Sequence, residues 1–153
     1  MLAQAEYDTA AAQEGLLAAK PYEIPVRAFE QKIEALAAAG SYFVLEVDGA
    51  PAGHLLLDPL GLASVRHVVQ LTIVVHPGHT GRGYGRALML HAIEWARRAE
   101  GVEKIELRVR STNPRAIALY ESLGFAREGV LRERIKLRDG YADDICMGLF
   151  VRE

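Results

Sequence analysis

The sequence predicts a mixed α/β domain of the α+β type, in which helices flank a twisted, mostly antiparallel sheet. Two Asp-Gly pairs, Asp48-Gly49 and Asp139-Gly140, each lie between segments with a strand pattern, as in β-hairpins. Between these hairpins, strand patterns alternate with helical patterns. The expected order is two helices, three strands, a helix, a strand, a helix and two final strands.

The N-terminal third of the chain predicts two helices and then a hairpin. Residues 2–19 are rich in alanine and other strong helix formers. Pro25 suits the first turn of a second helix, and Gly40 suits its end. Strands over 41–47 and 52–57 are expected to pair through the first Asp-Gly turn.

The middle of the chain predicts a central strand that leads into a helix. A long β-rich run covers 65–75, and its end at 71–75 is apolar on both faces, as in a strand covered on both sides. A glycine-rich loop follows, and a helical pattern starts at about Arg86 and covers 87–98.

The C-terminal third predicts a strand, a helix and a hairpin. Residues 104–110 alternate between apolar and charged side chains, so that Ile105, Leu107 and Val109 point one way and Glu106, Arg108 and Arg110 the other. Asn113 and Pro114 have the residue types of a helix cap and a first helical position. Strands over 125–136 and 141–151 complete the expected sheet.

The bulk properties limit the classes of function. A length of 153 residues fits one domain, 1–153, and no apolar run approaches the roughly 20 residues of a membrane span. No signal-peptide pattern is visible, and with a single cysteine we expect a protein of the reducing cytoplasm with no membrane partner. The formal charge of −2 argues against nucleic-acid binding. Cys146 is the single cysteine, which excludes an internal disulfide, and we expect it to pack in the last strand.

The loop at 76–86 predicts a phosphate-binding site. Gly81, Gly83 and Gly85 alternate with other residues just before a helix, where backbone N–H groups and the helix dipole favour an anion. The alternative is an ordinary strand-to-helix connection, but this glycine pattern with Arg82 and Arg86 exceeds what such a connection needs. The spacing matches neither the Rossmann fingerprint nor the P-loop.

Two motifs resemble the GNAT superfamily of N-acetyltransferases. The glycine loop resembles that family's pyrophosphate loop, V-x-P-x-[YF]-[RQ]-G-x-G-[IV]-G. Residues 113–125 match its second signature, N-x-x-A-x-x-L-Y-E-x-x-G-F. The resemblance covers residue 41 to the end of the chain. The tail 139–143 is similar to bacterial members that acetylate amino acids, herbicide-like amines or ribosomal-protein termini.

The resemblance implies an acetyl-CoA-dependent enzyme without a metal. Tyr120 matches the general acid that protonates the leaving thiolate, and a phenol is fully protonated at neutral pH. Asn113 matches the residue that reaches the pantetheine arm. The other implied acetyl-CoA contacts are backbone groups of Ile73, Val74 and Val75 for the pantetheine and of Gly81, Arg82, Gly83, Tyr84, Gly85 and Arg86 for the pyrophosphate. Alternatively, Tyr120 is a core aromatic and Asn113 only a helix cap.

The implied reaction is transfer of an acetyl group to the primary amine of a small molecule, such as an amino acid or an antibiotic-like amine. A protein N-terminus is the alternative acceptor, and a non-catalytic CoA-binding sensor is the alternative function. Residues 1–40 would form a helical segment on the acceptor side, and 41–153 would form the acetyl-CoA-binding core. The resemblance to the family also allows for a homodimer.

The sequence departs from the family pattern in two places. Thr80 stands where the loop usually has Arg or Gln, so it supplies a hydroxyl but no charge, and Arg82 or Arg86 would compensate. The usual first strand has no counterpart in the helical sequence that begins this chain, so either the start is truncated or the protein dispenses with that strand. An edge of the next strand would then need cover from a helix or a second subunit.

The sequence does not identify the general base that would remove the proton from the attacking amine. Gln70 stands where many relatives have a carboxylate, which leaves water-mediated deprotonation assisted by His67 or Glu106 as the favoured route. Glu106 alternatively only pairs with Arg108 or Arg110. Among the other histidines, His54 is expected to be buried and hydrogen-bonded, whereas His76 and His79 are expected to be solvated or near phosphate.

Overall fold

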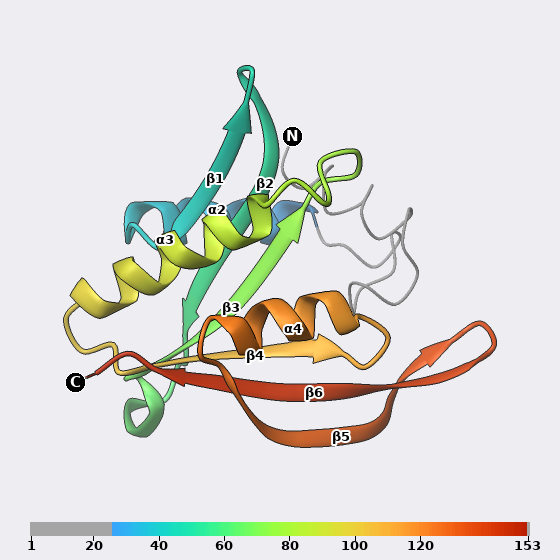
Figure 1. Cartoon of the computed structure of the whole chain (residues 1–153). Helices are drawn as coiled ribbons and strands as arrows, with labels where there is room; N and C mark the ends of the chain where they lie inside the picture. Colours follow the sequence, from blue (N-terminus) through green and yellow to red (C-terminus); the bar gives the residue numbers. More distant parts are fainter. Residues whose placement is uncertain (1–25, 153) are drawn as a thin grey trace.

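The computed structural model describes residues 26–152, which form one six-stranded open sheet in the order β1-β2-β3-β4-β6-β5 (Figure 1). Neighbouring strands are antiparallel except for β3 and β4, which are parallel. This confirms the mixed, mostly antiparallel sheet. In chain order the elements are α2 (Val26–Ala38), β1 (Tyr42–Val47), β2 (Ala50–Pro59), the 3₁₀ turn η2 (Ala63–Val65), β3 (Val68–Val75), α3 (Tyr84–Arg98), β4 (Lys104–Arg110), α4 (Pro114–Ser122), β5 (Ala126–Leu137) and β6 (Gly140–Phe150).

Every element expected after residue 25 is present, with boundaries shifted by no more than three residues, and two of the shifted starts have a clear cause. The helix expected from about Arg86 starts at Tyr84, because Gly83 adopts a left-handed φ of 83° and its carbonyl accepts the first helical bond, from Ala87. The strand expected from residue 65 starts at Val68, because the residues before it form η2. The helix expected over 2–19 and the question of a preceding strand lie outside the described residues.

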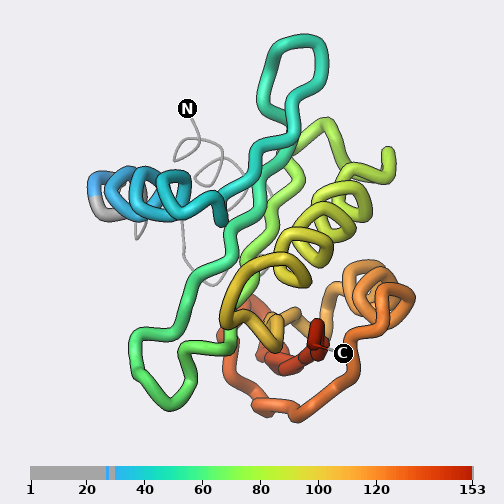
Figure 2. The backbone as a smooth tube through the Cα atoms, turned by 90° about the vertical axis from the view of Figure 1, so that its left-hand side faces the viewer, coloured from blue at the N-terminus to red at the C-terminus, as the bar shows by residue number. Residues whose placement is uncertain are grey.

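The helices lie on both faces of the sheet. α2 lies on one face, and α3 and α4 lie on the other (Figure 2). The core between the sheet and the last two helices is built from apolar residues that alternate along the strands, among them Leu55, Leu57, Ile105 and Met147. α3 contributes Met89, which is fully buried. The sequence pattern of one apolar face per element therefore accounts for this packing.

β3 and β4 separate partway along their length. They pair only where Val68–Gln70 lies beside Lys104–Glu106. Beyond Gln70, β3 pairs only with β2, and beyond Glu106, β4 pairs only with β6. The two strands diverge toward their C-terminal ends, as Figure 1 shows. This split leaves backbone groups along one edge of β3 without a neighbouring strand.

Candidate active site

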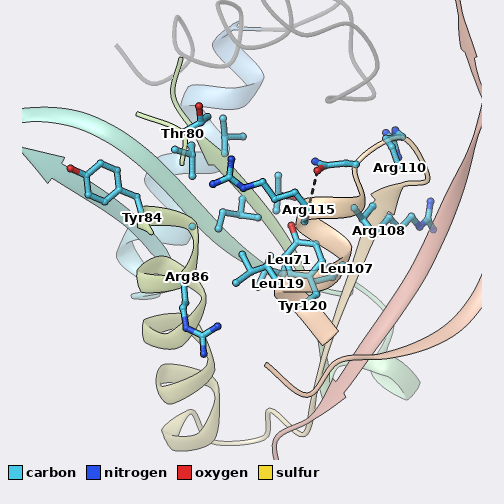
Figure 3. A pocket seen from close by; sticks show the side chains of 18 of the residues that line it. Leu71, Thr80, Tyr84, Arg86, Leu107, Arg108, Arg110, Arg115, Leu119 and Tyr120 are labelled. Carbon is cyan, nitrogen blue, oxygen red and sulfur yellow. Dashed lines mark hydrogen bonds between the residues drawn. The ribbon is translucent and has the colours of Figure 1, made fainter. Parts of the chain in front are cut away.

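A cavity of about 870 Å³ opens at the split between β3 and β4. Its walls come from the second halves of both strands, the glycine loop, the start of α3, the inner side of α4 and part of the β5–β6 pair. The connection from each strand to the following helix begins at this end of the sheet. The chain thereby brings the two motifs at 76–86 and 113–125, which are separated in sequence, to one site (Figure 3).

The glycine loop lines this cavity at the start of α3. Gly81 and Gly83 have φ values of 79° and 83°, which a residue with a Cβ adopts only with strain. Within the described chain, Ala87 is the first residue of this turn whose amide bonds a helical carbonyl, that of Gly83 at 3.1 Å. The amides before it have no helical partner, as at any helix start. Together with the dipole of α3, they form a site suited to an anion.

A basic side chain that the motif comparison did not single out reaches this loop. Arg115, on the first turn of α4, extends across the cavity toward Thr80 (Figure 3). A Cβ placed on Gly81 would lie 3.4 Å from Nη2 of Arg115. Arg86, one of the two residues expected to compensate for the missing charge at Thr80, donates a hydrogen bond from Nη1 to Ser122 Oγ at 3.0 Å.

Asn113 serves as the helix cap that its sequence position indicates. Its Oδ1 accepts a hydrogen bond from the amide of Ala116 at 3.1 Å, which begins α4. The side chain also lines the cavity. Because only the oxygen is used by the cap, the two N–H donors of the amide group remain for a ligand.

Tyr120 lies on the inner face of α4, at the floor of the cavity. Its ring packs beside Phe125, with the ring centroids 6.0 Å apart, and the residue is 7% exposed. Figure 3 shows the hydroxyl directed into the cavity. Burial raises the pKa of the Tyr120 phenol to about 12, because the low-dielectric surroundings disfavour the phenolate. The side chain is thus both a core aromatic and a protonated donor at the site.

The cavity is strongly cationic. Among the described residues that line it, five are arginines and one is a carboxylate, although the whole chain has a formal charge of −2. The charged lining residues are Arg86, Arg108, Arg110, Arg115, Arg134 and Asp144. A concave site of one sign concentrates its field on a ligand of the opposite sign.

Most of the predicted acetyl-CoA contacts line this cavity. They are Ile73, Val74, Val75, Gly81, Gly83, Tyr84, Gly85, Arg86 and Asn113. Arg82 is the exception, because it is exposed and does not line the cavity. A role for its backbone amide stays a prediction.

The structure brings neither favoured general-base residue to the cavity. Glu106 pairs with Lys104 at 2.9 Å rather than with Arg108 or Arg110. His67 precedes β3 at the paired end of the strands, where its carbonyl accepts the amide of Glu103 at 2.8 Å. A base acting through water therefore stays a prediction.

The histidines near the loop form a buried pair. His54 is fully buried, and its Nδ1 lies 2.9 Å from Nε2 of His76, which confirms the expected burial and hydrogen bonding of His54. The expectation that His76 is solvated is wrong, because this side chain is 7% exposed and its Nδ1 lies 3.0 Å from the Pro51 carbonyl. Since a carbonyl only accepts, His76 donates from Nδ1 to Pro51.

The sequence interpretation missed the polar side of the cavity formed by β4, β5 and β6. Arg108 and Arg110 were expected to point away from the apolar face of their strand, and the sequence assigned no role at the site to Arg134 or Asp144. Alternation along β4 was the available signal, because it puts two arginines side by side on one face. The pairing of that face with β6 depends on strand order, which the local pattern does not contain.

The comparisons with known proteins agree with this geometry. The family model described as the acetyltransferase (GNAT) family matches residues 8–125. Spermidine N(1)-acetyltransferase of Vibrio cholerae is 31% identical over 88 residues, which cover 58% of this chain and 51% of that protein. Ribosomal protein bS18-alanine N-acetyltransferase of Escherichia coli K12 is 43% identical over 77 residues, covering 50% and 51%. The chain thus aligns with about half the length of these curated relatives.

A solved structure shows the same fold. The structure of yncA from Salmonella typhimurium, determined with its cofactor acetyl-CoA, superposes with a TM-score of 0.88 at 23% identity. The match covers 99% of this chain and 87% of that one. Since the family model spans more than half of the chain, the protein belongs to the acetyltransferase (GNAT) family.

Proposed function

We propose that the protein is an acetyl-CoA-dependent N-acetyltransferase that acetylates the primary amine of a small molecule. One observation carries this proposal: a single cavity joins the glycine loop, where phosphate would bind, to the hydroxyl of Tyr120. The distribution of positive charge in the cavity also suits a cofactor that carries several phosphates. No helix in the described part of the chain is long and apolar enough to cross a membrane.

The split between the strands supports binding of an extended cofactor arm. Ile73, Val74 and Val75 lie on the part of β3 that pairs with β2 on one side only. Backbone groups on the other edge would bond the amides of pantetheine as a strand bonds its neighbour. The pyrophosphate would then lie against the amides from Gly81 to Arg86, with Arg115 supplying the charge that Thr80 lacks.

The proposed chemistry is direct attack of the amine on the thioester carbonyl. The new C–N bond forms as the C–S bond breaks, and the departing sulfur needs a proton. Tyr120 would donate that proton, since its phenol is protonated at any physiological pH. The proton lost by the amine would leave through water, because neither His67 nor Glu106 lines the cavity.

A thiol-release assay tests the proposal. The protein is mixed with acetyl-CoA and a panel of amines, and free CoA is measured together with the mass of the acetylated product. Acetylation of at least one primary amine supports the proposal. Measurable binding of CoA without turnover on any amine would instead support the non-catalytic sensor.

A protein N-terminus is the second candidate acceptor. It is favoured by the 43% identity with ribosomal protein bS18-alanine N-acetyltransferase. Short peptides with a free N-terminal alanine belong in the same panel, together with free alanine. A kcat/KM for the peptide well above that for every small amine would replace our first choice with this one.

The proposal also covers the N-terminal segment and the compartment. Residues 1–40 would contribute to the acceptor side of the cavity, and the protein would act in the cytoplasm. β1 has one strand neighbour among the described residues, and a second subunit would pair with its outer edge if the protein forms a homodimer. Light scattering at increasing protein concentration would show whether a homodimer forms.

A further inference from the structure

The cavity reaches the face of the sheet opposite the core that holds Tyr120. Leu107 and Val109 are buried in the core with Tyr120. Because side chains alternate along a strand, Arg108 and Arg110 project from the other face of β4. All five residues line the cavity, so the split between β3 and β4 connects the two faces. Figure 3 shows both arginines on the far side of Tyr120 from Tyr84.

Two guanidinium groups contact one carboxylate on this face, and Arg108 lines the same cavity from β4. Arg110 Nη1 donates to Asp144 Oδ1 at 2.6 Å, and Arg134 Nε lies 3.5 Å from Asp144 Oδ2. Arg110 is 8% exposed and Asp144 is 2% exposed. The buried Nε of Arg110 has no hydrogen-bond partner within residues 26–152. Asp144 therefore neutralises only part of the charge, and a buried donor remains unsatisfied.

The position of Arg134 is set by a bulge in β5. The register with β6 shifts between Leu131 and Ile135, and Glu133 in this segment has a left-handed φ of 51°. The Glu133 amide donates to Asp143 Oδ1 at 2.8 Å, which holds the bulge in place. A bulge redirects side chains at a strand. Here it lets Arg134 reach Asp144 from an otherwise exposed strand.

Asp143 also connects the bulge in β5 to the end of β4. The Asp143 amide donates to Ser111 Oγ at 3.0 Å, and the Ser111 amide donates to the Asp143 carbonyl at 3.0 Å. The arginines of β4 and β5 are thus held in a fixed relation. Such preorganisation lowers the entropic cost of binding a ligand.

We propose that Arg108, Arg110 and Arg134 bind a carboxylate of the acceptor, so that the preferred acceptors are amines that carry a carboxylate, as free amino acids do. This inference rests on the proposed function and names its substrate class. Guanidinium groups bind carboxylates through paired, charge-assisted hydrogen bonds. The same excess of positive charge disfavours a polyamine at this position.

Matched acceptors test the preference. L-Alanine and L-alaninamide share the amine and the side chain, but only the first has a carboxylate. We expect the wild-type kcat/KM to favour the acid by about 10- to 100-fold, the range of one or two charge-assisted hydrogen bonds. Spermidine should be acetylated less efficiently than the acid. A series of ω-amino acids would report the spacing between the amine and the carboxylate sites.

Arg134→Gln is the variant that tests the site. Arg134 is half exposed, so its loss should leave the fold intact, whereas loss of Arg110 would leave Asp144 buried without its closest cation. We expect Arg134→Gln to reduce the acid-to-amide preference by about tenfold, mainly through KM for the acid. Arg132→Gln, on the same strand but not lining the cavity, is the matched control and should keep the wild-type ratio.

A binding measurement separates this inference from the proposed function. N-acetyl-L-alanine and N-acetyl-L-alaninamide are titrated calorimetrically into the wild type and Arg134→Gln, each saturated with CoA. Tighter binding of the acid, reduced by Arg134→Gln, supports the carboxylate site even if no amine is acetylated. Equal binding of acid and amide by the wild type, or an unchanged difference in the variant, overturns it while leaving any observed acetylation intact.

Discussion

At the scale of single residues, the main feature of the site is a buried phenol at the floor of a cationic cavity. Tyr120 is held by the core on one side and faces the cavity on the other. Burial has two consequences for it: the position of the hydroxyl is fixed, and the raised pKa keeps its proton in place. Both properties are what a proton donor to a leaving group needs.

The substitution Tyr120→Phe removes the hydroxyl and keeps the aromatic ring, so it tests the role of the hydroxyl alone. We expect kcat to fall by about 10²-fold, the lower range of general-acid effects, because the departing sulfur then takes its proton from water. Affinity for acetyl-CoA, measured by calorimetry, should change little, since the ring still packs beside Phe125. If kcat is retained in this variant, the tyrosine has only a packing role.

The raised pKa of Tyr120 also predicts a loss of stability in alkali. Between about pH 10, where a tyrosine in the unfolded chain ionises, and the folded pKa of about 12, the unfolded state loses its proton before the folded state does. The free energy of unfolding should therefore fall through this range. Urea unfolding at about pH 8 and about pH 11 would measure it. Tyr120→Phe should show a smaller fall, and an equal fall would contradict the shifted pKa.

Arg115 predicts a different kinetic signature, because it lies against the glycine loop rather than beside Tyr120. Arg115→Gln should raise KM for acetyl-CoA by about tenfold, as expected for the loss of one charge-assisted hydrogen bond to phosphate. The kcat at saturation should be nearly unchanged. Arg82→Gln is the control, since Arg82 is exposed and does not line the cavity. A larger effect at Arg82 would show that the loop closes differently around the cofactor.

At the scale of helices and strands, local patterns predicted the elements, and long-range pairing decided the site. Alternation predicted β4, and the cap residue Asn113 predicted the start of α4. Neither pattern contains the order of the strands or the point where β3 and β4 separate. The bulge at Glu133 was also unpredictable, because its stabilising bond comes from Asp143 on another strand. The glycine loop and, through the family resemblance, Tyr120 were predicted from the sequence, whereas the cluster around Asp144 was not, because it depends on this long-range pairing.

Gly53 provides a test of how closely α3 approaches the sheet. A Cβ at this position would lie 3.0 Å from the Val74 carbonyl oxygen and 3.1 Å from Cδ1 of Leu88. Because the carbonyl belongs to a paired central strand, it cannot move freely. Gly53→Ala should therefore lower the free energy of unfolding by about 1–3 kcal/mol, the usual cost of overpacking. Denaturant unfolding would measure the change.

Gly61→Ala is the matched control, because a Cβ there meets no atom within 4 Å. Its effect should stay within about 0.5 kcal/mol, as at ordinary surface positions. Equal effects of the two substitutions would mean that the contact between α3, β2 and β3 is looser than the structure indicates.

At the scale of the whole molecule, charge is distributed unevenly. The formal charge is −2, but five arginines and a single carboxylate line the cavity among the described residues. Surface charges at a distance are screened by salt, whereas charges within a cavity act on a bound ligand at short range. The net charge argued against nucleic-acid binding, which stays a prediction, and it gave no indication of the local field at the site.

This charge distribution predicts that CoA binding stabilises the fold and that its phosphates supply most of the effect. At a CoA concentration about 100 times Kd, binding contributes about 2.7 kcal/mol, which for a chain of this size raises Tm by roughly 5–10 °C. Pantetheine lacks the nucleotide phosphates and should raise Tm much less at the same concentration. Added salt should reduce the shift with CoA, because it screens the attraction between phosphate and arginine. Thermal unfolding of the wild type and Arg115→Gln tests all three expectations. An equal shift in Tm with pantetheine and with CoA would mean that contacts along β3 dominate binding, rather than the glycine loop and Arg115.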